Sequence, residues 1–579
     1  MRGLSDYLNH VLEKIPNREK RPFLNYAVEE IEKSDFTFIE APTGYGKSAI
    51  SQAIALRSLN EGRKCIIAFP LRTLLEDQFS KFMSLGLPQD IIGVRYMHHP
   101  DSRYLIKPIT LTTVDTLSLT LFGIAPEDME RMVGYYYGMS RSLGHYLFSR
   151  AMVLLSDLVL DEVHLLADTT KSLNFLVALI RIFAEHGGRI VLMSATIPDA
   201  LENLLNEKIG GLRFVRFSES PDKDFLEKRK EKKYDVSLEK LEQKDKFKSI
   251  VKFLEEEFLE EGRNKGGRKR YKRAIVVFNT VREAIAFRKE LDQKLGELGI
   301  SRDRVLLLHS RFTKGDREWL NERIRKLRNY DDYLIISTQV IEAGVDISSN
   351  FFITDLAPAA SLIQRVGRFL RYSHEVKGKL VIWYEEDNQD AYKGIYDRDL
   401  IEKTLDFLFK NKINFHVPDS YKQLLNYVYD KNSFSVKEEE VNKLTSIPLA
   451  LEEPKLAIDT FMELEGSFVR ESSVVPVVPS RRLNSYRAIE EVREIIVPME
   501  LPSVLGIKPS EELVLSKDFR YAERRKVKIE KWYPKKVLRH VLSSGFVAFI
   551  VEASYDEELG MMIGDEQGER NGEGTELPR

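Results

Sequence analysis

Short runs of apolar and β-branched residues, separated by stretches of helical pattern, recur in two series along this sequence. The first series comprises residues 36–39, 65–69, 109–113, 158–161 and 190–193. The second comprises residues 274–278, 305–308, 333–337, 351–355 and 380–384. Continuous apolar strands are buried on both faces, and strands that alternate with helices form parallel sheets. The pattern therefore predicts an α/β chain with two tandem, doubly wound parallel sheets.

The length of 579 residues allows three or four domains of about 150 residues each. The first domain is predicted over residues 1–218 and the second over 219–415. Beyond residue 415 the alternation fades, which predicts a smaller mixed C-terminal accessory domain over 416–579. Its Gly- and Glu-rich tail from residue 564 is expected to be disordered.

Two charged stretches allow more than one interpretation. Residues 221–273 favour an inter-domain linker or surface loop, but seven Lys or Arg residues lie within 263–273, which also suits contact with a nucleic-acid backbone. Residues 520–536 are aromatic and basic. They favour an amphipathic surface strand or helix, with base stacking as the alternative.

Composition excludes several classes of protein. No apolar run approaches the roughly 20 residues of a membrane helix, and the N-terminus has no secretory apolar core. A single cysteine, Cys65, excludes an intrachain disulfide and a cysteine-cluster zinc site. We therefore expect a cytoplasmic protein with no membrane partner. With 88 basic and 90 acidic residues, any nucleic-acid surface must be local.

The string APTGYGKS at residues 41–48 follows the first predicted strand and precedes a helical pattern. Its glycines allow backbone N–H groups to turn toward phosphate, and the helix N-terminus adds its dipole. Lys47 would reach the β- and γ-phosphates and Ser48 would hold Mg²⁺. The string predicts an ATP and Mg²⁺ site, although a fortuitous glycine loop is the alternative. The predicted binding residues are Thr43, Gly44, Gly46, Lys47 and Ser48.

A second polar string, DEVH, ends the fourth predicted strand. Two carboxylates at the end of a buried strand are costly unless a metal and a water need them. Asp161 fits as the Mg²⁺ partner and Glu162 as the group that polarises the attacking water. His164 is expected to link this site to Ser194 and Thr196, which follow the next strand.

The second series carries the string QRVGRFLR. Arg368 and Arg371 are three residues apart, so they share a face if this segment is helical. Two guanidinium groups presented together suit the charge on a transferring γ-phosphate, whereas the alternative is a surface Arg cluster.

As a set, APTGYGKS, DEVH, SAT, STQVIEAGVDIS and QRVGRFLR resemble the superfamily-two helicases over roughly residues 20–390. The strings VFNT from Val277, LHSRF from Leu308 and SLI from Ser361 resemble the CRISPR-associated helicase of type I interference. The resemblance implies two RecA-like domains with ATP between them. It also implies an ssDNA-stimulated ATPase and 3′–5′ DNA helicase.

The resemblance assigns further residues to roles. Gly344 and Asp346 would approach the nucleotide, Gln364 would help to bind it, and Arg368 and Arg371 would be arginine fingers. Contacts to a strand's backbone position it without reading its sequence. Such contacts are expected from Pro70, Arg72, Thr113, Asn279, Thr280 and Thr338.

The family often carries an N-terminal HD nuclease, but here about 35 residues precede the first strand and no His-Asp dipeptide occurs. We therefore expect the helicase half of a split system, with a separate HD nuclease chain and a Cascade-like surveillance complex as partners. The adenine-reading glutamine is not evident near Arg21. An RNA helicase of the same superfamily and a non-catalytic nucleic-acid scaffold are the alternatives.

Overall fold

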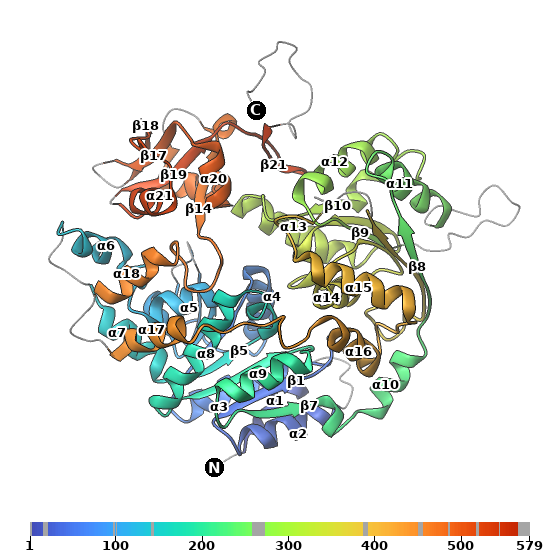
Figure 1. Cartoon of the computed structure of the whole chain (residues 1–579), viewed down its shortest axis with the longest axis horizontal. Helices are drawn as coiled ribbons and strands as arrows, with labels where there is room; N and C mark the ends of the chain where they lie inside the picture. Colours follow the sequence, from blue (N-terminus) through green and yellow to red (C-terminus); the bar gives the residue numbers. More distant parts are fainter. Residues whose placement is uncertain are drawn as a thin grey trace, which may run out of the picture.

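The computed structural model describes residues 3–14, 21–96, 99, 101–139, 144–257, 273–385, 392–449, 455–483, 487–516, 520–543 and 545–564. Most of the basic run 263–273 and of the tail beyond residue 564 lies outside these ranges. Figure 1 shows three sheets, of which the first and second carry the N-terminal and middle parts of the chain and the third carries the C-terminal part.

In the described residues the first sheet has seven strands, all parallel, in the order β3-β4-β2-β5-β6-β1-β7. The strands are β1 (Phe36–Glu40), β2 (Lys64–Phe69), β3 (Ile92–Arg95), β4 (Ile109–Thr113), β5 (Ser156–Leu160), β6 (Arg189–Ser194) and β7 (Arg213–Arg216). The helices are α1 (Leu4–Glu13), α2 (Pro22–Ile31), α3 (Ser48–Asn60), α4 (Arg72–Met83), α5 (Val114–Leu121), α6 (Met129–Tyr136), α7 (Tyr146–Leu154), α8 (Thr170–Glu185) and α9 (Asp199–Lys208). Helices α1 to α4 cover one face, and α5, α8 and α9 cover the other.

The second sheet is also entirely parallel, in the order β10-β11-β9-β12-β13-β8. Its strands are β8 (Lys233–Lys240), β9 (Arg273–Val277), β10 (Val305–Leu308), β11 (Tyr333–Ser337), β12 (Phe351–Asp355) and β13 (Lys377–Tyr384). The accompanying helices are α10 (Lys223–Lys230), α11 (Lys246–Glu257), α12 (Val281–Asp292), α13 (Lys314–Leu327), α14 (Ala359–Val366), α15 (Arg398–Lys410) and α16 (Pro418–Val428). Helices α13 to α16 pack on one face, and α11 and α12 on the other.

The third sheet is mixed, in the order β15-β18-β17-β19-β14-β16, and a separate hairpin pairs β20 with β21. The strands of the sheet are β14 (Val474–Pro479), β15 (Arg487–Ala488), β16 (Val497–Glu500), β17 (Glu511–Leu515), β18 (Tyr521–Lys526) and β19 (Phe546–Val551), and those of the hairpin are β20 (Ser554–Asp556) and β21 (Gly560–Met562). The helices are α17 (Glu438–Leu449), α18 (Lys455–Glu463), α19 (Ile489–Glu494), α20 (Leu501–Ile507) and α21 (Pro534–Val541). Two parallel sheets and a mixed third sheet confirm the predicted fold class.

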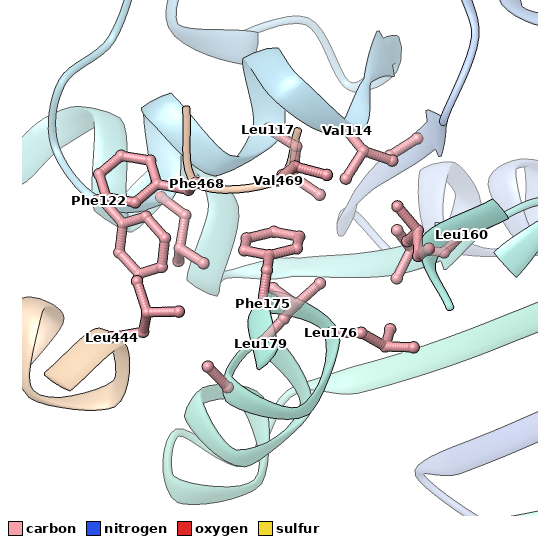
Figure 2. Close-up of a cluster of buried hydrophobic side chains, with 14 of the residues drawn as sticks. Val114, Leu117, Phe122, Leu160, Phe175, Leu176, Leu179, Leu444, Phe468 and Val469 are labelled. Atoms are coloured by element: carbon pink, nitrogen blue, oxygen red, sulfur yellow. The ribbon is translucent and has the colours of Figure 1, made fainter. Parts of the chain in front are cut away.

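The C-terminal part shares a hydrophobic core with the first sheet. Figure 2 shows Phe122 and Phe175 of the first domain beside Leu444 of α17 and Phe468. The rings of Phe122 and Phe468 lie 4.5 Å apart between centroids. Both rings are fully buried, so the contact belongs to one continuous core.

The charged segment between the two sheets is largely folded. The interpretation of residues 221–273 as a linker or surface loop is wrong over residues 223–257, which form α10, β8 and α11. Strand β8 pairs with β13 at the edge of the second sheet. An edge strand has one unpaired side and few buried side chains, so its sequence lacks a continuous apolar run.

In the aromatic and basic stretch 520–536, the described residues form β18 and the start of α21, which confirms the prediction of a surface strand or helix. Trp532 packs its ring 5.7 Å from that of Phe549. Among the helices of the described ranges, none combines the length and apolar character that crossing a bilayer requires.

Candidate nucleotide site between the two parallel sheets

Three neighbouring strands of the first sheet, β5, β6 and β1, end beside one another. The phosphate-loop string follows β1, the DEVH string follows β5, and Ser194 closes β6. Because the carboxyl ends of parallel strands meet at one edge, topology alone gathers these polar residues.

The phosphate loop has the backbone of an anion cradle. Gly44 and Gly46 adopt φ values of 77° and 106°, which favour glycine. Helix α3 begins at Ser48, so its N-terminus faces the cradle. Lys47 is buried and its Nζ donates to the carbonyl oxygen of Ala41 at 2.9 Å. The ammonium group is thereby held within the loop that precedes it.

The two carboxylates of DEVH are adjacent, with Asp161 buried and Glu162 half-buried. Glu162 adopts a left-handed φ of 52°, and its N–H donates to Asp161 Oδ1 at 2.9 Å. Burial and the charge of Glu162 raise the pKa of Asp161 above its usual range, although Lys47 opposes the shift. A buried carboxylate in this state favours a bound cation, because a cation relieves both effects.

His164 connects this string to the end of β6. Its Nδ1 lies 3.1 Å from Ser194 Oγ, and Ser194 Oγ donates to the carbonyl oxygen of Thr196 at 3.1 Å. Burial lowers the pKa of His164, so the imidazole is neutral. Since the serine hydroxyl hydrogen is committed to Thr196, the Nδ1–H of His164 donates to Ser194. These contacts connect the same three residues, His164, Ser194 and Thr196, that the sequence predicted to be linked.

The arginine pair lies in a turn that follows α14. The condition under which Arg368 and Arg371 would share a helical face is not met, because α14 ends at Val366 and Leu370 adopts a left-handed φ of 47°. Arg368 instead donates from Nε to the carbonyl oxygen of Ile341 at 2.9 Å and from Nη2 to that of Glu342 at 2.8 Å. The turn therefore fixes both arginines against the loop after β11.

Asp346 belongs to that loop and pairs with two arginines. Its Oδ1 lies 3.1 Å from Arg371 Nε, and its Oδ2 lies 2.9 Å from Arg328 Nη2. Burial alone would raise the pKa of Asp346, but Arg371 and Arg328 lower it. Gly344, predicted to approach the nucleotide, lies against Thr73 at the start of α4.

The two halves of the site meet across the sheets. A Cβ placed on Gly367 would lie 3.6 Å from Thr43 Cγ2 of the phosphate loop. Burial would raise the pKa of Glu162, but Lys47, His164, Arg368 and Arg371 together lower it. Glu162 therefore lies within the electrostatic reach of the arginine pair from the second sheet.

Several buried polar atoms here lack a hydrogen-bond partner within the described residues. They are Glu162 Oε2, Gln364 Nε2 and Arg371 Nη1. Such atoms are rare in folded proteins unless a ligand or water satisfies them. Within the same ranges no three His, Cys, Asp or Glu side chains gather as a metal site. One carboxylate and one hydroxyl nevertheless fit Mg²⁺, which takes its other ligands from phosphates and water.

The predicted nucleic-acid residues of the first sheet follow β2, the neighbour of β5, and β4, which lies beyond β2. Pro70 follows β2, and Thr113 ends β4 and caps α5 by accepting from Thr116 N–H at 3.4 Å. Arg72 begins α4, donates from Nε to Glu76 Oε1 at 2.6 Å and lies 4.4 Å from the centroid of the Tyr96 ring. Pro70 and Thr113 thus lie at the same carboxyl edge of the first sheet as the predicted nucleotide-binding residues.

In the second sheet the predicted contacts separate into two kinds. Thr280 caps α12. Thr338 follows β11, and its backbone N–H donates to the carbonyl oxygen of Leu308. Asn279 is buried, with Nδ2 donating to the carbonyl oxygen of Leu356 at 2.8 Å and Oδ1 accepting from Arg365 Nη2 at 2.8 Å. In this structure the side chain of Asn279 is used in contacts with Leu356 and Arg365 and does not face the expected path of a nucleic-acid strand.

Arg365 is a functional residue that the sequence did not single out. It is completely buried, and its Nε donates to Glu342 Oε1 at 2.9 Å. It thereby joins α14 to the loop that Arg368 also contacts. Within the string QRVGRFLR no local signal separates Arg365 from the other two arginines, because their burial follows from the turn after α14.

Two protein families match the chain by model. The DEAD/DEAH box helicase family matches residues 21–204, and the C-terminal region of the CRISPR-associated nuclease/helicase Cas3 matches residues 270–374. The first match covers strands β1 to β6 of the first sheet, and the second covers β9 to β12 of the second sheet. They therefore include the phosphate loop, the DEVH string and the arginine pair.

Similar proteins agree with these families. The CRISPR-associated nuclease/helicase Cas3 of Streptococcus thermophilus is 25% identical over 473 residues, which cover 71% of this chain and 48% of that protein. The chain thus spans about half the length of this relative. T. fusca Cas3 with AMPPNP has a TM-score of 0.63 at 15% identity, covering 96% of this chain and 71% of that one.

A chain in a CRISPR RNA-guided surveillance complex, pre-nicking, has a TM-score of 0.54 at 16% identity, covering 91% of this chain and 68% of that one. At such identity these structures show a common fold. The fold and the ordered motifs are those of an ATP-dependent helicase. Both family matches and the Cas3 relatives show that this chain is similar to the helicase region of the CRISPR-associated nuclease/helicases.

Proposed function

We propose that this chain hydrolyses ATP to move along single-stranded DNA in the 3′–5′ direction during CRISPR interference. The observation that carries the proposal is the approach of the two loops: a Cβ on Gly367, next to Arg368, would lie 3.6 Å from Thr43 Cγ2 in the phosphate loop of the other sheet. Cations from both sheets that bear on the carboxylate of Glu162 suit a reaction in which negative charge spreads over a phosphoryl group.

Each residue has a defined task in this proposal. The backbone of the phosphate loop and Lys47 bind the β- and γ-phosphates, and Ser48 and Asp161 hold Mg²⁺. The metal would neutralise phosphate charge. Glu162 orients and polarises the attacking water. Arg368 and Arg371 stabilise the charge that develops during transfer, and Gln364 contacts the nucleotide.

The nucleic-acid path follows the same edge of both sheets. Pro70, Arg72 and Thr113 would contact one stretch of a strand's backbone, and Thr280 and Thr338 the next. Each set belongs to a different sheet, so a change in their separation during the ATP cycle would advance the strand. His164, Ser194 and Thr196 would couple the two sites, since they connect the DEVH string to the end of β6.

The proposed setting is the cytoplasm, with a Cascade-like surveillance complex as partner. Similarity to Cas3 proteins and to a chain of a surveillance complex supports that setting. We propose that a separate HD-domain nuclease cuts the DNA.

The testing experiment measures steady-state ATP hydrolysis with no nucleic acid, with ssDNA and with ssRNA of equal length, at low and moderate salt. We expect strong stimulation by ssDNA. Lys47→Ala and Asp161→Asn should each reduce the rate by at least about a hundredfold, because phosphate and metal contacts are lost. Omission of Mg²⁺ should have the same effect.

Robust turnover by either variant would overturn the assignment of the site. Equal or greater stimulation by ssRNA would favour an RNA helicase, which would share every ATPase residue. Absence of hydrolysis under all conditions would favour a non-catalytic scaffold that binds nucleic acid. Translocation polarity is measured separately, by displacement of duplexes with a 3′ or a 5′ single-stranded tail.

A further inference from the structure

The segment that joins the two parallel sheets makes contacts with both halves of the nucleotide site. We call residues 222–232 the crossover segment; it consists of α10 and its flanking residues. At its start, Asp222 caps α10 by accepting from the N–H of Phe225 at 3.0 Å. The other carboxylate oxygen of Asp222 accepts from Tyr45 Oη at 3.0 Å. Tyr45 lies inside the phosphate loop, so the crossover segment begins anchored to that loop.

A second contact with the phosphate loop comes from the end of α10. Arg229 Nη2 donates to the carbonyl oxygen of Thr43 at 2.6 Å, and its guanidinium lies 4.8 Å from the centroid of the Phe225 ring. A Cβ placed on Gly44 would lie 3.5 Å from the same nitrogen. Within the described ranges no carboxylate forms an ion pair with Arg229, and burial lowers its pKa to about 10. Arg229 is thus a cation placed on the phosphate loop without a protein anion.

Three residues after Arg229, the segment reaches the turn that carries the arginine pair. Lys232 is buried, and its Nζ donates to the carbonyl oxygen of Leu370, to that of Tyr372 at 2.9 Å and to that of Glu375 at 3.2 Å. These three carbonyls belong to the turn that holds Arg371. Because Leu370 adopts a left-handed φ, this turn depends on contacts from outside it.

Between these contacts lies only one short helix. Helix α10 has eight residues, which correspond to about 12 Å at 1.5 Å per residue. A helix with both ends anchored transmits a displacement, whereas a flexible linker absorbs it. The general attraction of cations to a helix C-terminus does not explain why Arg229 contacts the phosphate loop. Lys230 lies in the same last turn of α10 and is exposed.

We propose that the crossover segment is a positioning strut, in which Arg229 fixes the phosphate loop and Lys232 fixes the turn that holds Arg368 and Arg371. The strut couples the phosphate loop to the arginine pair within one chain segment. Lys232 acts through the arginines and Arg229 through the backbone of Thr43, so neither needs to touch the reacting atoms. The inference rests on the proposed ATPase function.

The two cations have separable expected effects. Lys232→Met releases the turn without altering the phosphate loop, so it should lower kcat about tenfold to a hundredfold and leave KM within about threefold. Affinity for ADP with aluminium fluoride, an analogue of the transition state, should fall, whereas affinity for ADP should not. Arg229→Met should raise the KM for ATP and weaken ADP binding, and Arg229→Lys should restore part of both.

Lys230→Met is the matched control, since it removes an exposed lysine from the same segment. Thermal unfolding of every variant is compared with that of the wild type. If Lys232→Met does not fold, Lys232→Gln, which keeps one donor, replaces it in the same assays. Equal values for Lys232→Met and Lys230→Met, or equal losses of ADP and transition-state-analogue affinity, would overturn the strut. Failure of the wild type to hydrolyse ATP would instead overturn the proposed function.

Discussion

At Gly344 the loop after β11 packs so closely against the start of α4 that no side chain fits between them. A Cβ at this position would lie 2.5 Å from Thr73 Oγ1 and 2.7 Å from the backbone nitrogen of Leu74. Gly344 also adopts a φ of 80°, which strains any other residue. The glycine therefore sets how closely the second domain approaches the helix that carries Arg72.

We expect Gly344→Ala to impair the coupling between the domains. Gly86→Ala is the control, because Gly86 has a φ of 75° and nothing within 4 Å of an added Cβ. The strained backbone should cost each variant about 1 kcal/mol in the free energy of unfolding. Only Gly344→Ala should also lose nucleic-acid stimulation of ATP hydrolysis, since α4 must move. Equal stimulation in the two variants would contradict this role.

At the scale of elements, the sequence predicts central strands well and edge strands poorly. The ten apolar runs correspond to strands because each is buried on both faces. Among the edge strands of the two parallel sheets, β10 was predicted, whereas β3, β7 and β8 were not. IGVR of β3 is short, and RFVR of β7 and KYDVSLEK of β8 carry charged residues suited to a sheet edge.

The site shows the same division. Lys47, Asp161 and Glu162 lie in strings whose spacing reveals them. Lys232 and the exposed Lys230 lie in the same charged run. The sequence does not indicate which of the two is buried, and only the tertiary structure distinguishes them. The turn that holds Arg371 was also beyond prediction, because it depends on a left-handed Leu370.

The β20–β21 hairpin attaches the C-terminal part to the second domain. His309 Nδ1 accepts from the N–H of Arg311 at 3.1 Å, so its Nε2–H donates to the carbonyl oxygen of Leu559 at 3.0 Å. Gly560 packs against the same imidazole, and the N–H of Met561 donates to the carbonyl oxygen of Arg311 at 2.9 Å. Burial, together with the nearby charges of Arg311 and Arg317, lowers the pKa of His309 to about 3.

The hairpin contact should therefore weaken in acid. The pKa of His309 falls from about 6.5 in the unfolded chain, so the unfolded state binds the proton first. The contribution to stability is complete above that value and falls by about 1.4 kcal/mol per pH unit below it. Hydrogen exchange of residues 554–562, corrected for intrinsic rates, should show easier opening at pH 5.5 than at pH 7.5.

His309→Asn should reduce this pH dependence, because its amide does not titrate. The control is His374→Asn, which alters an exposed histidine of the same domain. A hairpin that opens equally at both pH values in the wild type would contradict the assignment to His309.

At the scale of the whole molecule, the C-terminal part is joined to both helicase domains by different means. Polar contacts of the β20–β21 hairpin and the buried side chain of Met562 hold it to the second domain, whereas a larger continuous apolar core holds it to the first (Figure 2). Helix α17 packs on α8, and α18 lies near α6. An apolar core is the stronger attachment, since its loss exposes buried surface on both partners.

This asymmetry predicts that the C-terminal part and the first domain unfold together. Phe468→Ala removes a buried ring that contacts Phe122 and should cost about 3–5 kcal/mol in the free energy of unfolding. Hydrogen exchange should then accelerate in α8 as well as in β14, while β9, β10 and β11 keep their protection. Phe409→Ala is the control, because that side chain is 59% exposed. Acceleration confined to residues 455–564 would show instead that the C-terminal part unfolds on its own, and the shared core would then be a contact between two independent units.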